Sequence, residues 1–132
     1  MEKKKITSFK DLDVYQRAYK ACIKVMTEII PKLPPREKYD LADQLSRSCK
    51  AVPRLIAEGF GKKHQKKGFQ KYLDDAMTES NESEVGLTQC KDLYYVEIDP
   101  VLSGSLANEY EIISKQIFKL REAWSKFSEI RN

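Results

Sequence analysis

The sequence predicts an all-α protein, an antiparallel up-down-up-down four-helix bundle. In four segments of the 132-residue chain, apolar residues recur every three or four positions, which is the spacing of one helix face. Short breaks rich in proline or glycine separate the segments, and short connections place neighbouring helices antiparallel. No segment alternates apolar and polar residues as a strand does. We expect one domain over 1–132, with helices near 11–33, 36–60, 66–98 and 104–130.

The first two predicted helices are separated by a proline-rich break. In the first helix, apolar residues from Tyr15 to Leu33 share one face. The stretch "PKLPPREK" ends it, because three prolines within five residues cannot continue a helix. The second helix repeats the apolar step as far as Ile56 and ends at Gly59 or Gly61. It contains Pro53, a defect that costs about 3 kcal/mol in a helix interior and must be offset by packing.

The third and fourth predicted helices differ in how clearly they are patterned. The third begins near Gly68, and its middle, "TESNESEVG", is polar, which weakens the helical periodicity. The stretch "EIDPVLSGS" contains the turn residues Pro100 and Gly104 and predicts the next loop. The fourth helix has a heptad-like seam with alternating steps of three and four. This seam consists of Leu106, Tyr110, Ile113, Ile117, Leu120, Trp124 and Phe127.

Composition limits the class of protein. No run of about 18 apolar residues is present, which argues against a membrane span. The N-terminal stretch "MEKKKITSFKDL" lacks the apolar core of a secretory signal, so we expect a cytoplasmic protein. Cys22, Cys49 and Cys90 are isolated from one another in the sequence, and each falls among apolar residues. This pattern predicts free, buried thiols.

Charge is divided unevenly along the chain, although the formal net charge is only +4. Residues 45–72 hold eight Lys or Arg and a single acid, Glu58. Residues 73–112 hold ten Asp or Glu and a single base, Lys91. A basic segment of this kind is typical of proteins with an acidic partner, either a nucleic acid or another protein surface.

The basic residues are predicted to form one surface that reaches one end of the bundle. On the second helix, three of them are spaced three and four apart and fall opposite the apolar face. The stretch "GKKHQKK" then extends the charge into the third helix. The candidate nucleic-acid-binding residues are Arg47, Lys50, Arg54, Lys62, Lys63, Lys66, Lys67 and Lys71. The alternative is that these side chains are simply solvated, or are neutralised by the acidic third helix of the same or a neighbouring chain.

Two side-chain arrangements are predicted beside this surface. Arg47 and Glu82 can form a bidentate ion pair that fixes the register of the second and third helices. Phe60, Phe69 and Tyr72 lie among the lysines, an arrangement that suits stacking of unpaired bases. Helical spacing favours core packing for Phe69 instead.

Motifs for catalysis and for cofactors are missing from the sequence. His64 is the only histidine, so the paired Glu-x-x-His motifs of di-iron bundles cannot be built in one chain. There is no Cys-x-x-Cys, no GxxxxGK, no GxGxxG and no nucleophile elbow. Glu79, Glu82 and Asp92 are more typical of solvated carboxylates than of a cation site. We therefore expect no catalytic residues, no metal and no cofactor.

The stretches "QLSRSCKAVPRLIAEG" and "FQKYLDDAMTESNE" resemble the 23S ribosomal RNA intervening-sequence protein family, also called the four-helix bundle proteins. Leu55 stands where the family often has Asn, and Thr78-Glu79 replaces a common Gly-Ser. The resemblance implies a bacterial, left-handed antiparallel bundle that often assembles as a ring-shaped homo-pentamer, without known catalysis. A similar fold serves as the accessory variability determinant of diversity-generating retroelements, a basic pentamer that binds a reverse transcriptase and nucleic acid. The most specific residues are Gln44, Leu45, Arg47, Pro53, Ile56, Ala57, Glu58 and Gly59, followed by Phe69, Leu73, Ala76 and Glu82.

Together, the residues and the resemblance predict a non-enzymatic homo-oligomeric scaffold. Through its basic surface it would bind RNA or DNA, or a nucleoprotein partner such as a reverse transcriptase. The alternative is a protein–protein interaction module whose basic surface makes only subunit contacts, meeting the acidic third helix of a neighbouring chain.

Overall fold

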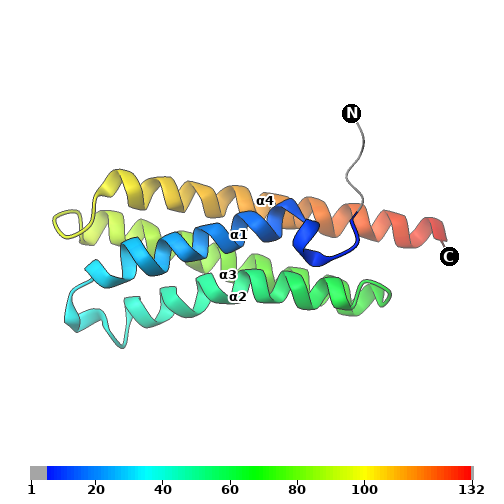
Figure 1. Cartoon of the computed structure of the whole chain (residues 1–132), viewed down its shortest axis with the longest axis horizontal. Coiled ribbons are helices and arrows are strands. Elements are labelled where there is room, and N and C mark those ends of the chain that lie inside the picture. The colour runs from blue at the N-terminus through cyan, green and yellow to red at the C-terminus, as the bar shows by residue number, and fades with distance from the viewer. Residues whose placement is uncertain (1–5, 132) are drawn as a thin grey trace.

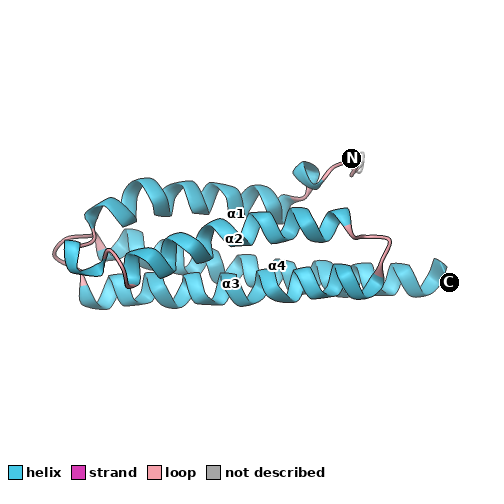
Figure 2. Ribbon diagram, turned by 90° about the horizontal axis from the view of Figure 1, so that it is seen from below, coloured by secondary structure: helices cyan, strands magenta, loops and turns pink. Residues whose placement is uncertain are grey.

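Four long helices lie side by side along the longest axis of the molecule (Figure 1). The structure, a computed structural model, describes residues 6–131, with side chains described as far as Trp124. Among the described residues there are no strands, and Figure 2 shows helices joined by loops. The prediction of an all-α protein with four helices is confirmed. The helices are α1 (Asp13–Lys24), α2 (Leu41–Gly61), α3 (Lys66–Leu93) and α4 (Pro100–Arg131).

The first helical stretch, predicted as one regular helix over 11–33, contains three kinds of turn. α1 passes into a π-helical turn at Val25–Ile29 and then into a 3-10 turn at Ile30–Lys32. Pro31 explains the change, because it has no N–H to donate to an earlier carbonyl and its ring crowds that carbonyl. A separate 3-10 turn, Phe9–Asp11, precedes α1.

The start of α2 lies later than the predicted residue 36. The prolines produce an isolated 3-10 turn at Pro35–Glu37, and the regular helix begins only at Leu41. The Glu37 carboxylate accepts a hydrogen bond from the Leu41 N–H at 3.3 Å. Glu37 also accepts a short hydrogen bond from the Tyr94 hydroxyl, so this connection is attached to the end of α3.

The boundary between α3 and α4 was predicted wrongly at both ends. α3 ends at Leu93 instead of 98, and α4 begins at Pro100 instead of 104. Asp99 Oδ1 accepts the N–H of Val101 at 2.9 Å and so satisfies a free donor of the first turn. Proline is favourable at a first helical position, where no N–H is needed. Pro100 therefore starts a helix and does not belong to a loop.

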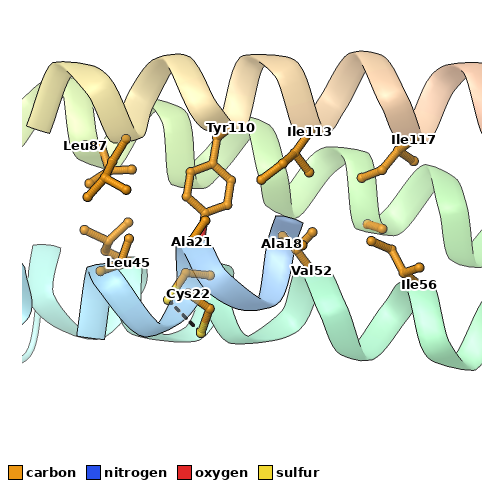
Figure 3. Packing of buried hydrophobic residues seen from close by; sticks show 14 of the residues in the cluster. Ala18, Ala21, Cys22, Leu45, Val52, Ile56, Leu87, Tyr110, Ile113 and Ile117 are labelled. Carbon is orange, nitrogen blue, oxygen red and sulfur yellow. Dashed lines mark hydrogen bonds between the residues drawn. The ribbon is translucent and has the colours of Figure 1, made fainter. Parts of the chain in front are cut away.

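The core lies between the four helices, and the predicted apolar faces of α2 and α4 supply much of it (Figure 3). On α4, Leu120 and Trp124 are half-buried, and Phe127 lies outside the described side chains. All three cysteines are free and buried, as predicted. The residues of these two faces that are at most 1% exposed are Leu45, Cys49, Val52, Ile56, Tyr110, Ile113 and Ile117.

The polar middle of α3 also belongs to the core. Ser80, Ser83 and Gly86 are buried between α3 and its neighbours. Ser83 Oγ lies 2.8 Å from Ser48 Oγ on α2, and the Ser80 hydroxyl donates to the Tyr110 carbonyl of α4 at 3.0 Å. Because these side chains are small and hydrogen-bonded, α3 packs closely on both α2 and α4.

Truncation of a core side chain on α4 should be costly. Ile113 is fully buried, so Ile113→Ala should lower the free energy of unfolding by about 2–5 kcal/mol through the cavity it leaves. Phe118, which is 46% exposed on the same helix, provides the control, and Phe118→Ala should change this free energy by about 0.5 kcal/mol or less. Urea unfolding followed by circular dichroism measures both, and equal losses would contradict the packing described here.

Candidate nucleic-acid interface

The eight predicted basic residues lie on the outer side of α2, in the loop that follows it and on the first turns of α3. This loop is the green turn at the same end of the molecule as the N-terminus in Figure 1. Lys63 is half-buried and the other seven residues are exposed. We call this set of cations the basic surface, although Arg47 borders the groove between α2 and α3 whereas Lys50 and Arg54 border one between α1 and α2. The basic surface consists of Arg47, Lys50, Arg54, Lys62, Lys63, Lys66, Lys67 and Lys71.

The loop between α2 and α3 is held in place by α4. The Trp124 Nε1–H donates to the Lys63 carbonyl at 3.0 Å, and the Trp124 ring lies 5.3 Å from the Phe69 ring, between centroids. The Lys63 ammonium lies 4.0 Å from the centroid of the Phe60 ring, within cation–π range. Aromatic contacts thus position the loop that carries the lysines.

Five cations of the basic surface make no ion pair with the residues that the structure describes. Arg47 is paired with Asp43, with 3.5 Å between Nε and Oδ2. Asp74, one of the acids of α3, is paired instead with Arg121 of α4, at 2.7 Å. This acid of α3 is therefore directed to α4 and not to the basic surface. In the part of the chain that the structure describes, no ion pair is made by Lys50, Arg54, Lys62, Lys67 or Lys71.

The predicted ion pair between Arg47 and Glu82 is not formed among the described residues. Both side chains line a groove of about 600 Å³ between α2 and α3. Asp43 takes the Arg47 guanidinium, because it stands one turn away on the same helix surface. Glu82 instead faces Glu79, whose pKa is raised by burial and by the neighbouring Glu82 charge. This groove therefore has an acidic wall.

The three aromatic residues expected to stack bases are buried or half-buried, so their rings are not freely exposed to solvent. Phe60 and Phe69 are 9% and 2% exposed and belong to the core, and Tyr72 is half-buried. Core packing, the preferred expectation for Phe69, is confirmed.

A second aromatic group, which the sequence analysis missed, lies between α1 and α2. The Tyr19 ring is 51% exposed, and its centroid lies 6.1 Å from that of Tyr15. The Phe9 ring packs edge-on against Tyr15 at 4.9 Å. A signal was present, because Tyr15 and Tyr19 are four residues apart and so share one side of a helix.

These rings form one side of a groove of about 350 Å³, which we call the aromatic groove. Lys50 and Arg54 of the basic surface border its other side. Flat apolar rings therefore face the same open space as two cations that make no ion pair among the described residues. The groove is lined by Phe9, Tyr15, Tyr19, Cys22, Lys50, Pro53, Arg54 and Ala57.

The described residues offer no group of three or more His, Cys, Asp or Glu side chains placed to hold a metal ion. His64 is exposed in the loop between α2 and α3. None of the described helices has both the length and the apolar character that crossing a membrane requires.

Comparison with known proteins places the chain in a family. No curated protein and no solved structure matches it. A family model described as the 23S rRNA-intervening sequence protein matches residues 10–119, a span that includes α1 to α3, most of α4 and the whole basic surface. The chain therefore belongs to the 23S rRNA-intervening sequence protein family.

Proposed function

We propose that this protein is a non-enzymatic, cytoplasmic scaffold that binds single-stranded nucleic acid, RNA in particular, through the basic surface and the aromatic groove. The observation that carries the proposal is their adjacency, since Lys50 and Arg54 belong to both. The family description, which names a 23S rRNA-intervening sequence protein, supports an association with RNA.

The two parts of the site have different roles in this proposal. Exposed lysines and arginines contact phosphates and release counterions, which gives affinity without sequence preference. The Tyr19 ring offers an unpaired base a flat surface for stacking, which a base inside a duplex cannot reach. Single strands should therefore bind more tightly than duplexes.

The proposal includes the antiparallel up-down-up-down order and assembly into a homo-oligomer, a pentamer by family resemblance. Figure 1 supports the helix order, because the connections between successive helices lie at alternating ends of the molecule. The acidic wall formed by Glu79 and Glu82 supports assembly, since it is complementary in charge to the basic surface of a second copy. A reverse transcriptase is a candidate partner of the assembled form.

Binding to single-stranded RNA should weaken steeply with salt if the basic surface contacts phosphates. Six contacts with a single strand imply about a 300-fold loss of affinity between 50 and 200 mM salt. Changing Lys50, Arg54, Lys62 and Lys67 together to Gln should lower affinity and flatten the salt slope by up to about three, because each lost phosphate contact with a single strand removes about 0.7. Fluorescence anisotropy with a labelled oligonucleotide measures both quantities.

The matched control removes the same charge from elsewhere. Lys20, Lys24, Lys32 and Lys119 are exposed and lie outside the basic surface. Their joint replacement by Gln should leave most of the affinity and the slope intact. Equal losses of affinity in the two quadruple variants would show that only net charge matters and that the basic surface has no special role. Absence of RNA binding by the parent at low salt would also contradict the proposal.

The aromatic groove makes a separate prediction. Tyr19→Leu keeps an apolar side chain but removes the ring, so affinity for single-stranded RNA should fall by about 5- to 150-fold, the effect of losing about 1–3 kcal/mol of stacking. The salt slope should stay unchanged, because no phosphate contact is lost. Tyr95, 63% exposed in the loop between α3 and α4, supplies the control, and Tyr95→Leu should bind like the parent. Identical affinities of the parent, Tyr19→Leu and Tyr95→Leu would show that the aromatic groove does not contact the RNA.

A second candidate function is protein–protein interaction without nucleic acid, favoured by the acidic wall of the α2–α3 groove. In this case Glu79→Gln combined with Glu82→Gln should dissociate the oligomer, and light scattering measures this directly. A single species at the monomer mass of 15.3 kDa in the parent would contradict both the ring and this second function.

A further inference from the structure

Two cysteines that are far apart in the sequence meet where α1 packs on α2. The Cys22 and Cys49 sulfurs lie 3.7 Å apart, joined by the dashed line in Figure 3. Cys22 is 7% exposed and Cys49 is fully buried. A disulfide bond is about 2.05 Å long, so the two sulfurs need to approach by less than about 2 Å to become bonded. The pair is therefore poised for a covalent link between the two helices.

The two thiols differ in access and in acidity. Cys22 lines the aromatic groove and can be reached by a small molecule from solvent, whereas Cys49 is not among the residues that line it. A hydrogen bond from Cys49 to the thiolate, together with the nearby Lys50 charge, outweighs the effect of burial and lowers the pKa of Cys22 to about 7. The same hydrogen bond and burial raise the pKa of Cys49. Cys22 thus has the character of an attacking thiolate and Cys49 that of a resolving thiol.

We infer that Cys22 and Cys49 form a reversible intramolecular disulfide when the protein meets a hydroperoxide, with Cys22 as the modified residue. The inference does not depend on the proposed function, because it rests on the contact of the two thiols and on the position of Cys22 in the groove wall.

The reaction has two balanced steps. The Cys22 thiolate attacks one oxygen of hydrogen peroxide, the O–O bond breaks and an S–O bond forms. The departing hydroxide takes up the proton that the thiol had lost, giving water and a sulfenic acid on Cys22. The Cys49 sulfur then attacks the Cys22 sulfur, the S–O bond breaks, and the hydroxyl leaves as water with the Cys49 proton. In total, two thiols are oxidised and one peroxide is reduced to two waters, and a dithiol reductant reverses the link.

The link would clamp α1 to α2 immediately beside Tyr15 and Tyr19. A bond between residues 27 positions apart removes loop-closure entropy from the unfolded chain. Oxidation should therefore raise the melting temperature by roughly 10 °C, and a dithiol should return it to the starting value.

The test uses the full chain, reduced, freed of reductant and treated with a small excess of hydrogen peroxide. Alkylation under denaturing conditions and intact mass spectrometry should then count one reactive thiol instead of three, with the mass lowered by about 2 Da for the bond. Peptide mapping should identify the Cys22–Cys49 link, and dithiothreitol should restore three thiols. Retention of all three thiols, or a bond that includes Cys90 or joins two chains, would overturn the inference.

Serine variants separate the two roles. In Cys49→Ser the sulfenic acid on Cys22 has no resolving partner, so dimedone should label Cys22, whereas in Cys22→Ser the buried Cys49 should stay unlabelled. Cys90, also buried, provides the control, and Cys90→Ser should form the link like the parent. Circular dichroism checks that each variant is folded. The peptide mapping of the parent tests the link even if a variant fails to fold. Equal labelling of Cys22 and Cys49 in the single variants would overturn the assignment of Cys22 as the modified residue.

Discussion

Close approach of α3 to both α2 and α4 is the constraint on which the rest of the structure depends. At its centre α3 presents small side chains, and a Cβ built on Gly86 would lie only 3.1 Å from Leu45 Cδ1. The buried serine hydroxyls in this close contact are hydrogen-bonded. Ser83 shares a hydrogen bond with Ser48 of α2, and Ser80 donates one to a backbone carbonyl of α4. A larger apolar residue would fill no void there, and overpacking typically costs about 1–3 kcal/mol. Close packing and hydrogen bonds between serine hydroxyls therefore stabilise the helix contacts, in addition to the burial of apolar surface.

This seam determines how α2 presents its charges. With Leu45 and Val52 buried in the core, a helix that turns 100° per residue must direct Lys50 and Arg54 outward. Three acids of α3 are directed elsewhere, since Asp74 pairs with α4, and Glu79 and Glu82 line the α2–α3 groove. Core packing therefore separates these acids from Lys50 and Arg54, neither of which makes an ion pair among the described residues.

The sequence predicted those features that depend on one helix alone, and it failed for those that depend on contacts between helices. Periodicity predicted the four helices and buried faces such as Leu45 to Ile56, because burying a face depends on the helix's own pattern. It failed for Ser80 and Ser83, since a hydroxyl is accepted in a core only when a partner on another helix satisfies it. The start of α4 was misplaced because the capping bond of Asp99 overrode the usual interpretation of Pro100 as a turn residue. For Arg47, the sequence analysis named only Glu82 on another helix, whereas the guanidinium pairs with Asp43, one turn earlier on α2.

The aromatic groove shows why the costly Pro53 belongs in α2. A proline inside a helix loses one backbone hydrogen bond, and here it does so within an unbroken helix, Leu41–Gly61. Its ring is buried and lines the groove together with Cys22 and Tyr19 of α1. Burial of the ring against α1 supplies the packing that offsets the lost bond, and the rigid ring gives the wall a fixed shape. The residue that most disturbs the helix thus lies where the apolar face, the cations and the thiol pair come together.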